Sequence, residues 1–404
     1  MKTTDPQQQS STRAFLAVVM AFVVVMMGTT LPTAIYRYYE LQYGFTPTVI
    51  TVIYASYAVG VLGALLIVGN WSDQLGRRRM LLTGLCAAAA AAITFLLSHD
   101  EPSLMLARLL SGVSAGIFTG TATVTVIELA PPAWHKHATL AATASNMLGL
   151  GCGPLLGGVL VELLPRPTQI PYIVHLLLVV IAMLGVWYAP ETAKLPAQVN
   201  LRPQRIALPA EVRSVFIPAA VAGFAGFVVV GFFAAVATQL IRVVLGYHSA
   251  MVIGAIVFLL FACSAIGQIA QVRIAARWRQ PIGCVGLLAG LLGIALCVPE
   301  RSMASLLIGT ALAGIGQGIS LRAGLGELTA KSPTDRRAEV TSSFFIVLYV
   351  AISLPVIGLG MVVQTEGIQR ATLIFAGSTI VLVLLALALL LRDAIGTAKK
   401  TDAL

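Results

Sequence analysis

The sequence has few charged side chains. Only 10% of its 404 residues are Asp, Glu, Lys or Arg, whereas 58% are hydrophobic, and soluble domains carry about 25% charged residues. This composition excludes a water-soluble globular domain. A helix needs about 20 apolar residues to cross a hydrocarbon core, and such stretches follow one another from Ala14 to Leu391. A lipid bilayer is therefore the expected environment.

The sequence also lacks cysteine motifs and a cleavable leader. All five cysteines lie in apolar stretches without C-x-x-C spacing: Cys86, Cys152, Cys263, Cys284 and Cys297. Neither a disulfide framework nor a metal site is therefore expected. The polar residues 1–11 lead into an apolar stretch that is too long for the core of a signal peptide, so the first span is expected to be retained.

Twelve stretches are long enough to cross a bilayer. Their ranges are 14–36, 47–69, 79–98, 102–128, 138–162, 170–189, 214–240, 249–271, 281–299, 301–327, 338–364 and 369–391. The longest loop is rich in proline and basic residues and lies between the sixth and seventh. The predicted fold is an all-α membrane protein with twelve transmembrane helices in two pseudo-symmetric bundles, residues 1–189 and 214–404, joined by a cytoplasmic linker, 190–213.

A weak internal repeat supports this division. The pairs Gly112 and Gly116, Glu128 and Pro132, and Pro154 and Gly158 are echoed by Gly314 and Gly318, Glu327 and Pro333, and Pro355 and Gly358. Repeated halves with a binding site at their interface are frequent in transporters. Chance recurrence of glycine is the alternative, because glycine is common in membrane helices.

The positive charge is distributed unevenly along the predicted topology. If both termini are cytoplasmic, 19 of the 26 Lys and Arg residues lie on that side, five lie on the other, and Arg108 and Arg322 lie inside spans. Positive residues collect on the cytoplasmic side of membrane proteins. Both termini are therefore predicted to be cytoplasmic, and the net charge of +10 does not require a nucleic-acid partner.

A motif with two glycines, one acid and several arginines joins the second and third spans, at residues 69–79. Its key residues are Gly69, Asp73, Gly76, Arg77 and Arg78. Glycines allow two helix ends to approach closely, and an aspartate pairs with arginine or with a helix N-terminus. The alternative is an anchor that only fixes orientation.

This segment resembles the signature loop of the major facilitator superfamily, G-x-x-x-D-x-x-G-R-R/K. The resemblance implies that Asp73 and Arg77 belong to a cytoplasmic latch that stabilises the outward-facing state, with Glu128 as the ionic partner. The corresponding turn of the second half, residues 271–280, keeps three arginines but lacks the acid and the glycines.

The fourth span contains Arg108 ahead of Gly112 and Gly116. A charged residue inside a membrane usually faces a cavity or a partner, although snorkelling to the interface is an alternative. The arrangement resembles the family's fourth-helix motif, in which the arginine is linked to proton coupling. The stretch 112–116 also matches the G-x-S-x-G motif of hydrolases, so an intramembrane enzyme using Ser114 and His175 is a rival hypothesis.

The fifth span matches a second family motif. Gly149, Gly153, Pro154, Gly157 and Gly158 fit the pattern G-x-x-x-G-P-x-x-G-G of the family's antiporters. A proline frees a backbone carbonyl and kinks a helix, and glycines on one face allow close helix packing. A kink that serves packing alone is the alternative.

No acidic residue lies in the middle of a predicted span. Arg108, Arg322, Tyr36 and His175 are the candidates for proton coupling or for the lining of the substrate cavity. Two arginines would leave the cavity positive, which favours anionic, zwitterionic or neutral substrates. Arg322 could instead reach the cytoplasmic interface, and a structural role is the alternative for His175.

The sequence as a whole therefore predicts a secondary transporter in the bacterial inner membrane that exports small organic molecules in exchange for protons. The proton gradient would drive it without a cofactor or metal, and a monomer is expected. The same-fold alternative is an importer or facilitator of a small organic anion.

Overall fold

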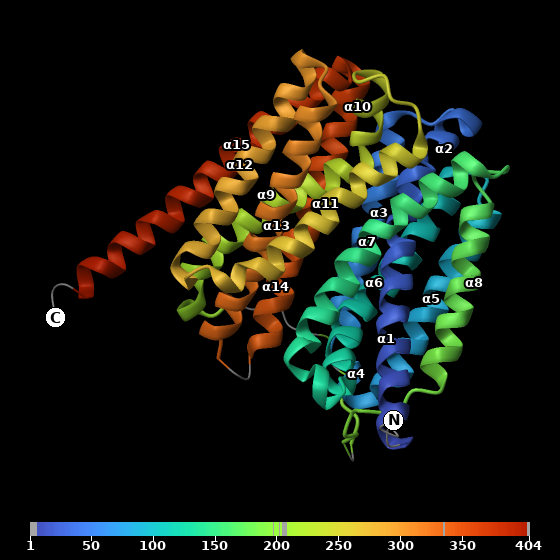
Figure 1. Cartoon of the computed structure of the whole chain (residues 1–404), viewed down its shortest axis with the longest axis vertical. Coiled ribbons are helices and arrows are strands. Elements are labelled where there is room, and N and C mark those ends of the chain that lie inside the picture. The colour runs from blue at the N-terminus through green and yellow to red at the C-terminus, as the bar shows by residue number, and fades with distance from the viewer. Residues whose placement is uncertain (1–5, 197, 202, 204–207, 334–335, 402–404) are drawn as a thin grey trace, which may run out of the picture. The chain divides into compact units, whose positions relative to one another are not determined.

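The computed structural model describes residues 6–196, 198–201, 203, 208–333 and 336–401, and these residues form helices and loops without a β-strand (Figure 1). The first eight α-helices are α1 (Pro6–Thr30), α2 (Tyr36–Tyr43), α3 (Pro47–Val68), α4 (Trp71–Leu75), α5 (Arg77–Leu97), α6 (Glu101–Leu129), α7 (Ala138–Leu163) and α8 (Ile170–Trp187). They are followed by α9 (Arg213–Ala235), α10 (Ala237–Val243), α11 (Ala250–Ala270), α12 (Ala276–Glu300), α13 (Met303–Lys331), α14 (Arg337–Ala351) and α15 (Leu354–Thr401). Four short 3₁₀ helices complete the described part of the chain: η1 (Leu31–Ala34), η2 (Pro132–His137), η3 (Ala210–Val212) and η4 (Gln271–Arg273).

Eleven segments of the described chain are long and apolar enough to cross a membrane. The last segment, Glu339–Arg392, contains 54 residues, and a helix of this length would span about 81 Å, more than twice the roughly 30 Å of a hydrocarbon core. Gly367 interrupts it with φ 82° and ψ 164°. The segment therefore accommodates the last two predicted spans, and the structure agrees with an all-α membrane protein of twelve spans.

The first predicted span is broken rather than continuous. The helix α1 ends at Thr30, and η1 continues the chain from Leu31. Pro32 explains the change, because it has no N–H and disfavours α-helical geometry at the residue before it. The break leaves the last carbonyls of α1 without partners in their own helix.

The chain divides into two compact units. The first unit consists of Met1–Phe45, Ile53–Arg205 and Ser249–Phe258, and the second of Thr46–Val52, Ile206–His248 and Leu259–Leu404. The predicted boundaries at residues 189 and 214 stay a prediction. Some of the predicted linker, namely residues 197, 202 and 204–207, lies outside the described residues.

In the first unit, α1 is the central helix. It packs against α5, α6, α7 and α8 (Figure 1). The rings of Phe22 in α1 and Phe118 in α6 are 6.3 Å apart, and Phe95 in α5 stacks on Tyr172 in α8 at 4.5 Å. The residues of α1 therefore lie within reach of the motifs on α6 and α7.

The start of α6 is fixed by a capping box. The carboxylate of Asp100 accepts a hydrogen bond from the backbone N–H of Ser103, at 3.0 Å, and the Asp100 N–H donates to the Ser103 hydroxyl, at 3.4 Å. Hydrogen bonds from Ser103 hold the pKa of the Asp100 carboxyl below its usual value. The cap sets the position at which Arg108 enters the bundle, two turns further along.

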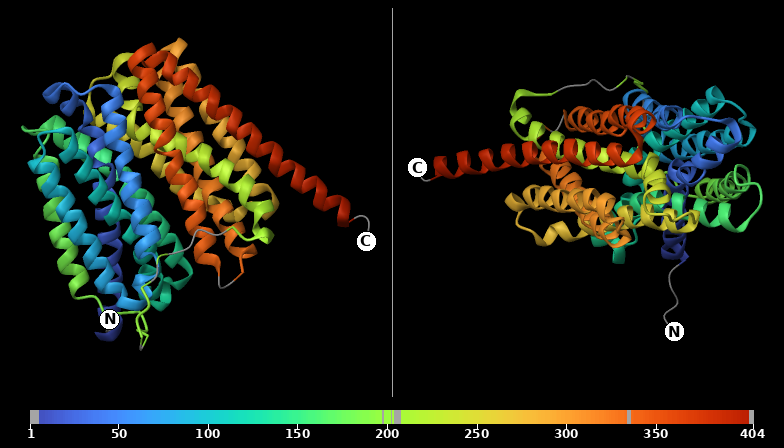
Figure 2. Two further views of the ribbon diagram at one scale, coloured as in Figure 1. Left: turned by 180° about the vertical axis from the view of Figure 1, so that it is seen from behind. Right: turned by 90° about the horizontal axis from the view of Figure 1, so that it is seen from above.

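In the second unit, α12 and α13 cross closely. A Cβ at Gly290 of α12 would lie 2.4 Å from the backbone nitrogen of Ala313, and a Cβ at Gly316 of α13 would lie 2.4 Å from that of Leu287. Larger residues would separate the helices. The helix α15 packs against α9 and α12 and then extends beyond them toward the C-terminus (Figure 2).

Candidate functional site

The side chain of Arg77 organises the signature loop. Its Nη1 lies 2.5 Å from Oδ1 of Asp73, and its Nη2 lies 3.3 Å from Oε1 of Glu128. Nη1 also donates a 2.7 Å hydrogen bond to the hydroxyl of Ser72. Because Glu128 belongs to the last turn of α6, the guanidinium ties the loop to that helix. The structure thus brings three predicted latch residues together, and their role as a latch stays a prediction.

A further carboxylate, that of Glu191, binds the start of α5. It accepts hydrogen bonds from the backbone N–H groups of Arg77, at 2.7 Å, and Arg78, at 3.2 Å. A carboxylate at this place satisfies N–H groups that have no partner within the helix and interacts favourably with the helix dipole. Gly76 has φ 104°, and a Cβ on it would lie 2.4 Å from the Glu191 carboxylate. Both the backbone geometry and the close approach require glycine here.

The chain beyond α8 is attached to the same loop at two more points. The hydroxyl of Thr192 donates a 2.5 Å hydrogen bond to Glu128. The side-chain amide of Gln74 donates to the backbone carbonyl of Asn200, at 2.7 Å, and accepts from its N–H, at 2.5 Å. Glu191, Thr192 and Asn200 therefore all contact the signature loop or its partner Glu128. The side chain of Arg78 is exposed, and Gly69 lies in the turn after α3.

Arg108 is buried inside the first unit, with 1% of its surface exposed. Nη1 donates a 2.5 Å hydrogen bond to the carbonyl of Thr29, and Nη2 donates a 3.3 Å hydrogen bond to the carbonyl of Tyr54. The guanidinium also lies over the rings of Tyr57 and Tyr54, at 4.8 and 5.3 Å from their centroids. Such contacts stabilise a cation away from water. Among the described residues, no carboxylate forms an ion pair with Arg108.

The Thr29 carbonyl is one of those left without a partner by the break in α1. A helix C-terminus carries partial negative charge and attracts cations. The buried Arg108 therefore binds the end of a helix instead of a carboxylate. Tyr36, two residues after η1, is also buried, interacts electrostatically with Arg108, and has no hydrogen-bond partner for its hydroxyl among the described residues.

His175 packs against α1 at a neighbouring position. Its Nε2 lies 3.1 Å from the carbonyl of Val24, and because a carbonyl only accepts, Nε2 carries the proton and Nδ1 is the free acceptor in the neutral ring. A cavity of about 10 Å³ is bordered by His175, Ser111, Ser114 and Tyr172 among others. This is about the space of one water molecule. The hydroxyl of Ser114 donates to the carbonyl of Gly84 at 2.7 Å.

Arg322 lies in the second unit. It is half-buried, and its Nη1 donates a 3.0 Å hydrogen bond to the carbonyl of Gln268, in the last turn of α11. Beside this contact, the hydroxyl of Ser264 donates to the amide oxygen of Gln317 at 2.6 Å, and Gln268 donates to the same hydroxyl at 3.3 Å. These buried polar residues of α11 and α13 were not predicted from the sequence.

The glycines of the antiporter motif lie on two faces of α7. A Cβ on Gly149, Gly153 or Gly157 would contact α1 or η1, at 2.6, 2.3 and 3.1 Å respectively. A Cβ on Gly158 would instead lie 2.3 Å from the backbone of Ala250, at the start of α11. The motif therefore allows α7 to lie against two helices at once.

Pro154 lies inside α7. A proline at this position removes the N–H that would bind the carbonyl four residues earlier, that of Leu150. The hydroxyl of Thr30 donates a 2.7 Å hydrogen bond to this carbonyl. The kink in α7 is thus completed by a side chain from the end of α1.

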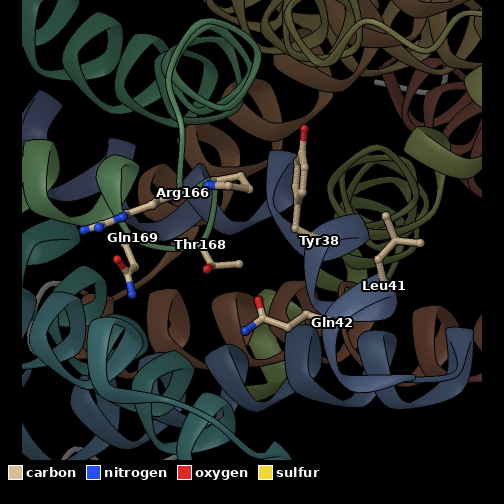
Figure 3. Close-up of a pocket in the computed structure, with 7 residues that line it drawn as sticks. Tyr38, Leu41, Gln42, Arg166, Thr168 and Gln169 are labelled. Carbon is tan, nitrogen blue, oxygen red and sulfur yellow. The ribbon is translucent and has the colours of Figure 1, made fainter.

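A wide recess lies at the end of the first unit, with a volume of about 720 Å³, within the range of small-molecule sites. Tyr38, Leu41 and Gln42 of α2 stand on one side of it and residues 166–169 on the other (Figure 3). Arg166 is its charged lining residue and has φ 57°. The recess offers amide, hydroxyl and guanidinium groups, and none of its residues was predicted as a site.

Comparison with known families identifies the chain. The model of the Major Facilitator Superfamily matches residues 15–355. The chain belongs to this superfamily. The crystal structure of the human organic anion transporter MFSD10 (TETRAN) is similar to this chain, with a TM-score of 0.67 and 18% identity. The match includes 94% of this chain and 99% of the MFSD10 chain. A bacterial homologue of the human lysosomal transporter Spinster, solved in an inward-facing and unoccupied conformation, is also similar, with a TM-score of 0.74 and 14% identity. This match includes 97% of this chain and 99% of the homologue's chain. At these identities the likeness shows the fold of this superfamily.

Two curated members of the superfamily are similar over short stretches. MdtD of Salmonella typhimurium, which is named for multidrug resistance, is 27% identical over 145 residues, 36% of this chain and 31% of the relative. The arabinose-proton symporter of Bacillus subtilis is 32% identical over 91 residues, 22% of this chain and 20% of the relative. The chain thus spans about a third or less of the length of these relatives. The findings together show a multi-pass membrane protein of this superfamily.

Proposed function

We propose that this transporter exports small organic molecules in exchange for protons, by alternating access. The observation that carries the proposal is the position of the antiporter motif against the end of α1. Gly149 and Gly153 lie against α1, and the carbonyl that Pro154 releases binds Thr30. The motif thus both packs α7 against α1 and binds the end of α1, beside the carbonyl that Arg108 contacts.

The buried position of Arg108 supports proton coupling. In a nearly dry site, a guanidinium charge interacts strongly with neighbouring groups. A rearrangement of its surroundings therefore changes the electrostatic potential at those groups strongly. Tyr36 interacts with it electrostatically, and His175 in the same unit offers a free Nδ1. These groups are the candidates for passing a proton in the first unit. Arg322, which binds the Gln268 carbonyl at the end of α11, is the corresponding candidate in the second unit.

The contacts of Arg77 support a latch on the cytoplasmic side. The ion pairs with Asp73 and Glu128 join the signature loop to α6, and Glu191 joins it to the linker. We place both termini and this loop in the cytoplasm of a bacterium, with the chain acting as a monomer in the inner membrane. The positive-inside distribution of Lys and Arg supports this orientation.

Import of a small organic anion is the second candidate. It is favoured by the absence of a carboxylate beside Arg108 among the described residues, which leaves positive charge in the first unit. The similarity to MFSD10, which is named an organic anion transporter, supports the same candidate. The two candidates differ in the direction of transport.

Catalysis at Ser114 has weaker support. Ser114 and His175 border one cavity, but its volume of about 10 Å³ leaves no room for a substrate. Ser114 lies in the middle of α6 and donates to a backbone carbonyl, whereas a nucleophile elbow lies on a turn between a strand and a helix. The variant Ser114→Ala should therefore keep transport.

The direction is tested by comparing accumulation of metabolites and antibiotics in cells with and without the gene. Export predicts lower accumulation of the substrate when the gene is present, and the difference should disappear when a protonophore collapses the proton gradient. Higher accumulation in cells with the gene would overturn export and support the importer. An effect that persists without the gradient would overturn proton exchange.

A further inference from the structure

Two predicted motifs meet at adjacent residues of α1. Arg108, from the motif of α6, binds the backbone carbonyl of Thr29 at 2.5 Å. Thr30, the next residue, donates from its side chain to the Leu150 carbonyl in the antiporter motif of α7, at 2.7 Å. Thr29 and Thr30 are the last residues of α1 before η1, and both are buried.

Both hydrogen bonds replace bonds that a helix would normally supply. Thr29 lies in the last turn of α1, where carbonyls have no N–H partner within the helix, and the missing N–H of Pro154 deprives the Leu150 carbonyl of its own partner. A buried carbonyl without a partner is unfavourable. In each case a group of another helix therefore binds the carbonyl that its own helix leaves without a partner. The two α1 residues that take part, Thr29 and Thr30, are adjacent.

We propose that Thr30 is a positioning residue that couples Arg108 to the kink of α7. A displacement of the guanidinium moves the end of α1 through the Thr29 carbonyl, and the Thr30 hydroxyl carries this movement to the Leu150 carbonyl. The hydroxyl holds α7 against α1 at the kink, where Gly153 permits contact with Oγ1 of Thr30. This inference rests on proton exchange as the proposed function, because it assigns the connection between the proton-coupling arginine and the antiporter motif.

Three single variants of the full-length protein separate the hydroxyl from the shape of the side chain. Thr30→Val removes the donor and keeps the branched shape, whereas Thr30→Ser keeps the donor. Thr125→Val is the matched control, since Thr125 is a buried threonine of α6 whose hydroxyl donates within its own helix, to the carbonyl of Thr121 at 2.7 Å. Thr30→Val should alter the protein, and the other two should behave like the wild type.

Two readouts need no knowledge of the substrate. The first is proton leak into proteoliposomes that contain pyranine, under an imposed pH gradient. The second is the rate at which maleimide labels Cys152, a half-buried residue between Leu150 and Pro154, measured by mass spectrometry as the labelled fraction of this cysteine. Thr30→Val should change each rate by about fivefold, the ratio for the loss of a hydrogen bond of about 1 kcal/mol.

A double-mutant cycle makes the test specific. Pro154→Ala restores an N–H that can bind the Leu150 carbonyl within α7, so Thr30→Val should change labelling less than about twofold in that background. Additive effects of the two substitutions, or failure of Thr30→Ser to match the wild type, would overturn the coupling role. If the wild type exchanges no protons while the cycle is non-additive, the proposed function fails and the Thr30–Leu150 connection stands.

Discussion

The imidazole ring of His175 rests on the backbone of Gly28, so closely that a Cβ on Gly28 would lie 2.3 Å from its Cε1 and Nε2 atoms. Both residues lie in the interior of the first unit. The contact fixes how near α8 can come to α1, and it holds Nε2 beside the Val24 carbonyl.

The variant Gly28→Ala should therefore destabilise the protein by about 1–3 kcal/mol, the usual cost of overpacking a core. The measurement is the melting temperature in detergent. Gly120→Ala in α6 is the control, because no atom would lie within 4 Å of its Cβ. Adding His175→Ala to Gly28→Ala should recover part of the loss, and an unchanged melting temperature in Gly28→Ala would contradict the contact.

Replacing Arg108 should abolish active transport. Arg108→Ala leaves the Thr29 carbonyl buried without a partner, which costs about 1–3 kcal/mol, and removes the charge that proton coupling requires. Arg108→Lys keeps a charge but cannot present the planar guanidinium to two carbonyls, so it should retain only a small fraction of the activity. Substrate flux in proteoliposomes under a proton gradient measures both, and normal flux in Arg108→Ala would refute the assignment.

Neutralising Asp73 should shift the balance between outward-facing and inward-facing states. Asp73→Asn weakens one ion pair of Arg77 and leaves that with Glu128, so a moderate change is expected, and Asp73→Asn with Glu128→Gln should change more. The measurement is the labelling rate of Cys152 by an impermeant maleimide added from outside. Equal rates in the wild type and in the double variant would eliminate the latch.

Substituting Gly76 should disturb the latch more than backbone strain alone explains. Gly76→Ala forces a residue with a Cβ into a positive-φ geometry and pushes that Cβ against the Glu191 carboxylate. Gly44 also has a positive φ, 69°, with no atom within 4 Å of its Cβ. Gly44→Ala reports the strain of a left-handed helical geometry, about 1–2 kcal/mol, whereas Gly76 has a different geometry, with φ 104° and ψ 143°. The Glu191 contact is therefore isolated by comparing Gly76→Ala in the wild type and in a Glu191→Ala background, and the fall in melting temperature should be larger in the wild type. Equal falls in the two backgrounds would mean that the Glu191 contact contributes nothing.

The sequence predicted the spans well, because apolar stretches of about 20 residues have few alternatives in a membrane. It also indicated which residues share the signature loop, since Asp73 and Arg77 lie four residues apart in one short motif. The family model and the fold confirm the assignment to the superfamily. The break at Thr30 was less evident, because Pro32 lies near the end of a stretch that reads as one span.

The partners of the motif residues were harder to predict. Nothing local to Glu191 shows that its carboxylate reaches back to the first turn of α5, 114 residues earlier. The Thr30 hydroxyl was likewise one of several in the first span. Its target is defined only when α1 and α7 lie side by side, because a freed carbonyl can be satisfied from any neighbouring helix.

Arg108 has no counter-ion among the residues that the structure describes, and this has an electrical consequence. A guanidinium held by carbonyls and aromatic rings keeps its full unit charge, so any displacement along the membrane normal does work against the transmembrane voltage. Moving one charge across the whole membrane corresponds to about 2.3 kcal/mol per 100 mV, and a shift through a tenth of that drop to about 0.2 kcal/mol. The turnover rate should therefore depend on voltage even where the exchange of substrate for protons carries no net current.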